Sequence, residues 1–135
     1  MTDKINILHP KNWLAPKGYA NDVAAQGRQV FIAGQIGWNE NAMLVSDDFV
    51  AQVEQALKNI IAVLAEAGGE PRHLVRLTWY LTDKSEYLAR QKEIGSAYRR
   101  VIGRHFPVMT AVVVAGLIEE GAKVEIEATA ILSAG

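Results

Sequence analysis

The 135-residue sequence contains no cysteine and has no excess of either charge: 14 lysine and arginine residues against 15 aspartates and glutamates give a formal net charge of −1. The absence of cysteine excludes disulfides, thiol nucleophiles and thiolate metal sites. A near-neutral chain with scattered basic residues also lacks the electrostatic footprint of a protein that binds nucleic acid or an anionic membrane. We therefore expect neither a nucleic-acid partner nor a membrane partner.

Long hydrophobic runs are also missing. The longest, residues 108–118, is interrupted by Thr110 and is too short to span a bilayer. Residues 1–4 lack the apolar stretch of a signal peptide, so we expect a cytoplasmic protein. His9, His73 and His105 are far apart and show no metal-ligand spacing. No metal and no cofactor is therefore expected.

What is present predicts one folded domain over residues 1–135. The hydrophobic fraction is 50% and the charged fraction 21%, both ordinary for a folded domain. Residues 1–18 are predicted to be irregular because two prolines and a glycine interrupt them. Residues 19–25 and 29–33 are predicted strands, joined by a turn around Gly27.

Two helices and a strand follow in the predicted order. Apolar residues recur at steps of three and four from Phe49 to Leu64, which predicts an amphipathic helix with cap candidates at residues 46–48. Residues 74–81 form a predicted strand. Asp83 and Glu86 have capping-box spacing, and a second helix is predicted from there to Gly103.

The C-terminal residues predict a hairpin, with arms at 106–117 and 123–132 and a loop at 118–122. The first arm is apolar on both faces. The second arm alternates and places Glu125 and Glu127 on the same face. The element order is β-β-α-β-α-β-β, an α+β layer with both helices on one face of the sheet. An apolar opposite face would need covering, which predicts an oligomer whose sheets face inward.

Several short segments in this order resemble the Rid family of reactive intermediate deaminases, also called YjgF-type proteins or L-PSP endoribonucleases. They are Gly18-Tyr19, residues 32–36 (IAGQI), residues 65–68 (AEAG), Phe106-Pro107 and residues 124–130 (VEIEATA). The resemblance implies a chorismate-mutase-like α+β fold. It also implies a homotrimer that binds a small organic molecule in clefts between subunits, where better-known members hydrolyse enamines and imines.

The resemblance also implies site residues, with one departure from the family's pattern. Glu125 takes the place of the pocket glutamate and is the predicted catalytic residue. The family's Arg-Ser-Cys triplet is here Met109, Thr110 and Ala111, so the arginine that holds the substrate carboxylate is replaced by a thioether. The predicted substrate-binding residues are Tyr19, Ala33, Gly34, Trp38, Met109, Thr110 and Ala111.

Alternatives stay open at each of these positions. Glu125 could position water against a C=N carbon, or could be a structural carboxylate at a subunit junction. Glu127 invites a paired-carboxylate hydrolase interpretation. Trp38 could wall the pocket or pack on its own loop, and Arg28 or Arg104 could replace the missing clamp or remain solvated. For the whole protein, the hypotheses are an imine deaminase with altered substrate preference, a non-catalytic ligand-binding or regulatory trimer, and an endoribonuclease.

Overall fold

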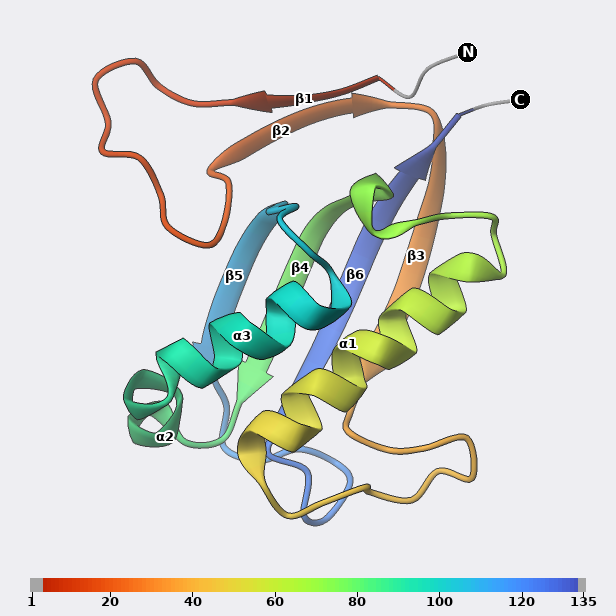
Figure 1. The fold of residues 1–135 in the computed structure, drawn as a ribbon, viewed down its shortest axis with the longest axis vertical. Helices are drawn as coiled ribbons and strands as arrows, with labels where there is room; N and C mark the ends of the chain where they lie inside the picture. The colour runs from red at the N-terminus through yellow and green to blue at the C-terminus, as the bar shows by residue number, and fades with distance from the viewer. Residues whose placement is uncertain (1–3, 134–135) are drawn as a thin grey trace.

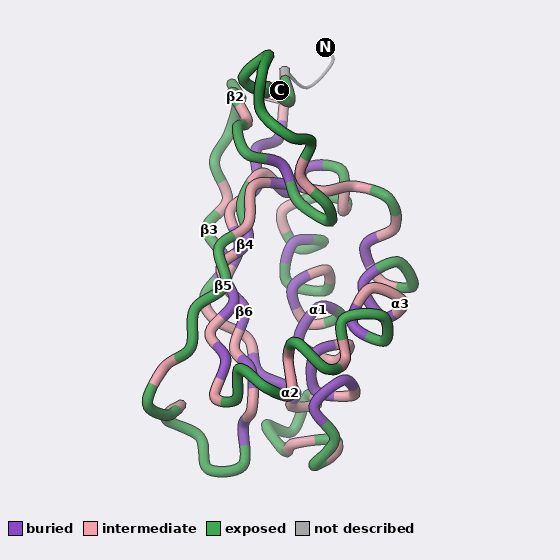
Figure 2. The backbone as a smooth tube through the Cα atoms, turned by 90° about the vertical axis from the view of Figure 1, so that its left-hand side faces the viewer, coloured by how far each residue is buried: buried purple, intermediate pink, exposed green. Residues whose placement is uncertain are grey.

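The computed structural model describes residues 4–133 and shows a mixed α+β fold, which confirms the predicted class. A four-stranded sheet has the strand order β3-β6-β4-β5, and a separate two-stranded sheet pairs β1 with β2. Helices α1 and α3 lie side by side over one face of the larger sheet (Figures 1 and 2). The elements are β1 (Lys4–Leu8), β2 (Asp22–Gln26), β3 (Arg28–Gln35), α1 (Phe49–Ala65), a 3-10 turn (Pro71–His73), β4 (Leu74–Leu81), α2 (Lys84–Ala89), α3 (Gln91–Val101), β5 (Val108–Val113) and β6 (Val124–Leu132).

Helix α1 forms where the apolar spacing predicts it. The Asp48 carboxylate accepts a hydrogen bond from the Ala51 N–H at 2.9 Å and so caps the first turn. Gly68, at φ +81°, follows its end in the left-handed conformation that glycine adopts without strain. Neither α1 nor any other helix of residues 4–133 has the length and apolarity needed to cross a bilayer.

The core lies between α1, α3 and one face of the sheet. Strand β6 alternates as predicted: the even-numbered residues from Val124 to Ala130 are buried, while Glu125 and Glu127 between them are half-exposed. Leu77 and Trp79 of β4 are buried on the same side. The opposing surface is the apolar stripe of α1, whose fully buried members are Val53, Ala56, Leu57, Ile60 and Leu64.

The predicted C-terminal hairpin is wrong. Strands β5 and β6 do not pair with each other, because β4 lies between them: it is parallel to β5 and antiparallel to β6. Helices α2 and α3 provide the crossover that a parallel pair requires. The segment 114–123 is therefore a connection that passes the end of β4 rather than a hairpin loop.

The N-terminal prediction also needs correction. Residues 4–8, predicted to be irregular, form β1, which pairs with β2 (Figure 1). Strands β2 and β3 do not form a hairpin, although Gly27 does mark the bend between them. At φ +148°, an added Cβ at Gly27 would lie 2.0 Å from the Leu132 carbonyl oxygen. The chain bends there to pass from one sheet to the other, instead of folding back on itself.

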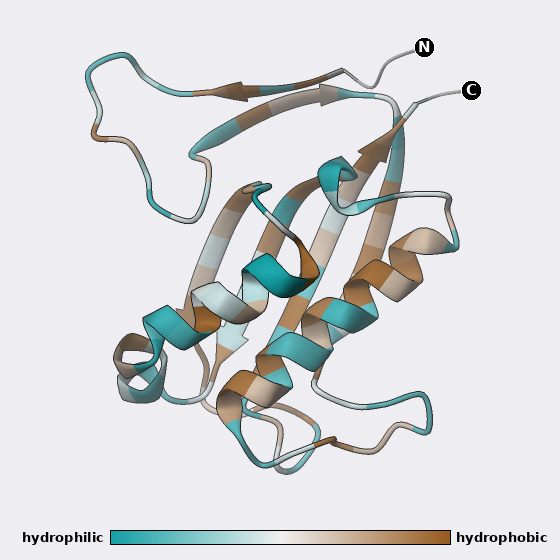
Figure 3. Cartoon of the chain, viewed as in Figure 1, coloured by the Kyte–Doolittle hydropathy of each residue, from teal (hydrophilic) through white to brown (hydrophobic). Residues whose placement is uncertain are grey.

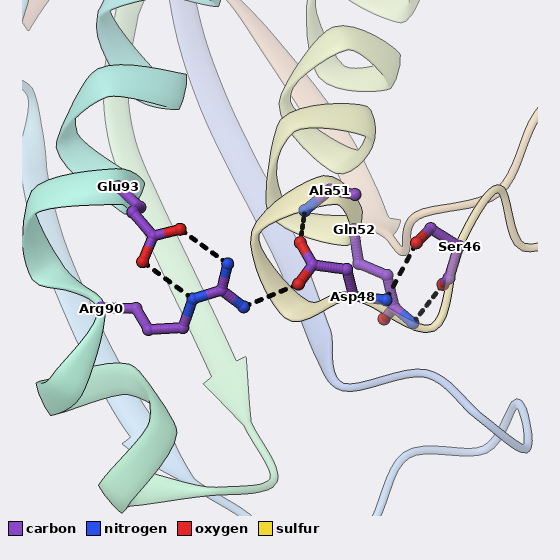
Figure 4. Close-up of polar contacts among 6 residues, drawn as sticks. All are labelled: Ser46, Asp48, Ala51, Gln52, Arg90 and Glu93. Atoms are coloured by element: carbon purple, nitrogen blue, oxygen red, sulfur yellow. Dashed lines mark hydrogen bonds and ion pairs between the residues drawn. The ribbon is translucent and has the colours of Figure 1, made fainter.

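The second predicted helix is divided into α2 and α3 at Arg90. That residue leaves the helical region (φ −117°, ψ 27°) and begins α3. Its guanidinium donates to Asp48, the cap of α1, at 2.7 Å and to both carboxylate oxygens of Glu93 (Figure 4). One cation thus joins the first turn of α3 to the first turn of α1. The capping prediction at Asp83 is confirmed, because its carboxylate accepts from the Glu86 N–H at 3.1 Å.

The sheet face opposite the helices is less apolar than predicted. The Tyr80 hydroxyl donates to Glu127 at 2.5 Å, and Arg76 donates to Thr129 at 3.1 Å. Apolar side chains on the same face are Phe31 of β3, 70% exposed and level with Thr129, and Val112 of β5, 41% exposed and level with Tyr80. Figure 3 shows that hydrophilic and hydrophobic residues alternate along the strands. A partner covering this face would therefore meet hydrogen-bonding groups as well as apolar side chains.

Replacing Asp48 with alanine should lower the free energy of unfolding near neutral pH by about 0.5–2 kcal/mol, because the α1 cap and the Arg90 contact are both lost. The Arg90 hydrogen bond, followed by the Ala51 N–H, lowers the pKa of Asp48 below its ordinary 3.8. A depressed pKa stabilises the fold above the unfolded-state pKa, and that contribution is lost as pH falls through the folded-state pKa.

The difference between wild type and Asp48→Ala should therefore shrink below about pH 4 in urea titrations. The neighbouring Asp47→Ala is the control, since the capping carboxylate is that of Asp48. Equal losses in the two variants would contradict the capping role.

Candidate functional site

Tyr19 and Met109, predicted substrate contacts far apart in sequence, line one cavity of about 470 Å³. It lies between the loop before β2, helices α2 and α3, and strands β4 and β5. Met109 is level with Leu77 of β4, so its side chain is on the helix-covered face, half-buried against the core. Five aromatic side chains line the cavity: Tyr19, Trp79, Tyr87, Tyr98 and Phe106.

The aromatic wall is held by contacts between α3 and the chain before β5. The rings of Tyr98 and Phe106 stack with centroids 5.6 Å apart, and the Tyr98 hydroxyl donates to the His105 carbonyl at 2.6 Å. Burial raises the pKa of Tyr98, so this hydroxyl stays a donor at any physiological pH. Trp79 and Tyr87 meet edge to face, with centroids 6.5 Å apart. These contacts fix the rings before any ligand binds.

Glu125 lies on the other face of the sheet, against Gly34. The pairing of β3 with β6 shifts register between Ile32 and Gln35, and this bulge contains Gly34. An added Cβ there would lie 2.0 Å from Glu125 Oε2, so a side chain at position 34 would displace the carboxylate from this place. Ala33 is exposed beside them, in a cavity of about 370 Å³ that Arg76 and Glu127 also line. The predicted residues Ala33, Gly34 and Glu125 are therefore neighbours in the fold.

Glu127 differs from Glu125 in having a defined partner. It accepts the hydrogen bond from Tyr80, and that bond raises the pKa of the Tyr80 hydroxyl. Because Glu127 holds a neighbouring strand's side chain, the geometry favours a structural role over a paired-carboxylate hydrolase. Among residues 4–133, Glu125 makes no hydrogen bond to another side chain, so its carboxylate is the one of the two that is left for a ligand.

One copy of the chain does not bring the two halves of the predicted site together. Glu125 is level with Tyr80 and Val112, three residues along β5 from Met109, and β4 lies between. Strand spacings place the two Cα atoms about 14 Å apart, with side chains on opposite faces. Ala33 and Gly34 are farther still, on β3 at the opposite edge of the sheet from β5.

The other predicted residues lie outside the aromatic cavity. Trp38 forms an isolated bridge with Leu44 in the loop after β3, in keeping with the loop-packing alternative. Thr110 and Ala111 are exposed on β5, on opposite faces of the strand. Arg28 donates to the Ala67 carbonyl at 2.7 Å, at the end of α1, which is a structural use of that cation. Arg104 lines a different hollow, under the β1–β2 loop.

Sequence reasoning missed several cavity residues. Trp79 and Tyr98 lie within a predicted strand and a predicted helix, and nothing in the sequence marks them, Lys17 or Arg99 as residues of one cavity. Alternation along β4 could have identified the buried face of Trp79, but not what lies above it. Within residues 4–133, no group of three or more acidic or histidine side chains could hold a metal ion.

Comparison with known proteins gives one consistent result. The family model described as Endoribonuclease L-PSP matches residues 11–132. The chain is 38% identical over 122 residues to protein DfrA of Myxococcus xanthus, covering 87% of this chain and 86% of that protein. It is 33% identical over 105 residues to human 2-iminobutanoate/2-iminopropanoate deaminase, covering 77% and 73% of the two chains.

Solved structures agree with the sequence relatives. The Rid-family protein YyfB from Yersinia pestis superposes with a TM-score of 0.84 at 32% identity, covering 95% of this chain and 98% of that one. Rv2704 of Mycobacterium tuberculosis, of the YjgF/YER057c/UK114 family, gives a TM-score of 0.64 at 35% identity, with 85% and 87% covered. The sequence motifs, the fold and both kinds of relative therefore assign this chain to the Rid (YjgF) family.

Proposed function

We propose that the protein is an imine or enamine deaminase that hydrolyses a C=N bond to a carbonyl and ammonia. The observation that carries the proposal is the Glu125 carboxylate held over Gly34 at the β3 bulge, beside the exposed Ala33. The related human protein is named as a deaminase of 2-iminobutanoate and 2-iminopropanoate. The substrate preference of this chain is altered because Met109 stands where a carboxylate clamp is expected.

The chemistry needs only water and a group that moves protons. The water oxygen attacks the imine carbon while the Glu125 carboxylate accepts a proton from the water. That proton passes to the nitrogen and leaves a carbinolamine. Glu125 then takes the proton of the new hydroxyl group and delivers it to the nitrogen, so the C=O bond forms as the C–N bond breaks and ammonia leaves with both protons of the water. No electron donor or acceptor is required. Tyr19, 36% exposed at the mouth of the aromatic cavity, would donate a hydrogen bond to the substrate.

The active assembly is proposed to be a homotrimer with clefts between subunits. The argument comes from the positions of the two site halves, since Met109 and Glu125 lie on opposite faces of one sheet and cannot share a substrate within a chain. A second copy whose β3 edge, next to Glu125 of β6, meets the β5 edge of the first would join them. The exposed Val112 and Val113 at that edge would be covered by the same contact.

A non-catalytic ligand-binding or regulatory trimer is the second candidate. The half-buried Met109 favours it, because a thioether in the clamp position leaves a small substrate carboxylate without a bidentate partner. An endoribonuclease activity, which the matching family model's description names, has less support. Glu125 and Glu127 on the open sheet face would repel a phosphate backbone, and the net charge of −1 gives no compensating attraction.

The assembly can be measured directly. Light scattering of the purified protein at micromolar concentration should give the mass of three chains. Introducing a charge at the β5 edge with Val112→Glu should shift the equilibrium toward smaller species, whereas Ile118→Glu, at a fully exposed position away from the sheet, should not. A wild-type protein that stays monomeric would remove the basis for a cleft between subunits.

Glu125→Gln should abolish ammonia release from imines generated in solution, because the amide keeps the shape but does not accept a proton at physiological pH. Gly34→Ala should lower turnover at least about tenfold by displacing the same carboxylate. The control is Gly116→Ala, whose added methyl group would meet nothing within 4 Å. Turnover by Glu125→Gln within a few-fold of wild type would make Glu125 structural.

The departure at position 109 gives a further prediction. Wild type should hydrolyse the 2-imino acid of alanine with a low kcat/KM. Met109→Arg should raise this kcat/KM about tenfold or more, because a guanidinium holds a carboxylate through two charge-assisted hydrogen bonds. Assembly is measured first, since a charge introduced beside the core can destabilise the fold. An intact variant that gains nothing would show that the missing arginine does not limit activity.

A further inference from the structure

We infer that the aromatic cavity selects an anion with a bulky aromatic side chain, and that Arg99 at its mouth holds the anionic group in place of the missing arginine. The inference rests on the proposed function, since it names the substrate class of that site as aromatic 2-imino acids. The walls of the cavity and the positions of two cations each support it.

The cavity has the size and the chemistry for an aromatic ring. Its volume of about 470 Å³ is within the range of small-molecule sites. Five aromatic side chains and Met109 surround it, and rings pack favourably edge to face or offset against one another. The thioether of Met109 adds a polarisable apolar contact where a guanidinium would bring charge among the rings. Burying a phenyl group there is therefore favourable.

The cation lies at the opening of this cavity. Arg99 follows Gly95 by one helical turn of α3, and both line the cavity. A Cβ built on Gly95 would lie 3.5 Å from Arg99 Nη1 and would meet no other atom within 4 Å. The guanidinium thus folds back over a position that has no side chain. Within the described part of the chain Arg99 has no carboxylate partner, whereas the adjacent Arg100 is paired with Glu54 at 2.5 Å.

A second cation fits the same ligand. Lys17, across the cavity from α3, also has no acidic partner among residues 4–133 and adds positive charge at the opening. A ligand with a negative charge supplies the partner that Arg99 and Lys17 lack.

Gly95 explains why the opening is free. Glycine is unfavourable inside a helix, yet here it follows the first turn of α3. Any side chain at this position would stand at the cavity mouth, between Arg99 and the ligand. Gly95→Leu should therefore fold at least as well as wild type while blocking the cavity.

The test uses three probes that share carbon skeletons with phenylalanine and alanine: 3-phenylpropanoate, its neutral amide 3-phenylpropanamide, and propanoate. Calorimetric titration of the wild-type assembly should show 3-phenylpropanoate binding about tenfold or more tightly than propanoate, because of the buried ring. Arg99→Gln should raise the dissociation constant of 3-phenylpropanoate about fivefold. It should change the dissociation constant of the neutral 3-phenylpropanamide less than about twofold. Arg100→Gln, the matched control, should leave the affinity for both aromatic probes unchanged. Gly95→Leu should lower the affinity for both.

Equal binding of propanoate and 3-phenylpropanoate would overturn the inference, as would equal effects of Arg99→Gln and Arg100→Gln. Ammonia release from the imines of phenylalanine and alanine is measured in the same preparations. If the binding pattern holds and no imine is hydrolysed, the deaminase proposal fails and the aromatic anion site stands. If Glu125-dependent turnover prefers the imine of alanine, the deaminase proposal stands and the substrate class is wrong.

Discussion

The alternation of strand β6 is the constraint on which the rest of the structure depends. This strand pairs with both β3 and β4, so it is the middle of the sheet and cannot slip by one residue without turning its carboxylates into the core. The buried side chains of β6, Val124, Ile126 and Ala128, face the core beneath α1. Glu125 and Glu127, which alternate with them, therefore lie on the open face. The same two-residue period therefore builds the core and presents the acid.

The second consequence is that the predicted site residues are divided between the two faces of the sheet. On the helix side, the crossover through α2 and α3 encloses aromatic rings around Met109. On the open side, the β3 bulge admits the Glu125 carboxylate over Gly34. A substrate that contacts both Met109 and Glu125 must lie where two chains meet, so the proposed catalysis depends on assembly. The polar groups Tyr80 and Arg76 on the open face also favour a specific contact over a purely hydrophobic one.

The replacement at position 109 is coherent with its surroundings. An arginine there would have to leave its charge among Trp79, Tyr98 and Phe106, or reach past them toward solvent. Methionine instead completes an apolar wall, while Lys17 and Arg99, which have no acidic partner among residues 4–133, lie at the opening. Compared with a family member that has arginine at position 109, the positive charge in this chain lies at the opening of the cavity rather than inside it. A substrate with a larger side chain and an anionic end matches that arrangement.

The sequence by itself determined the α+β class, helix α1 with its cap among residues 46–48, and the two-faced character of β6, because these depend on short-range spacing that local geometry enforces. Family motifs also predicted Gly34 and Glu125 as site residues, and the structure places these two side by side. Only the tertiary structure decided that β4 separates β5 from β6, since two adjacent apolar segments look like a hairpin until a crossover is placed. It likewise decided that Arg99 and Trp79 share a cavity with Met109. These residues come from α3, β4 and β5, and no sequence period relates side chains that meet only when a helix packs across a parallel strand pair.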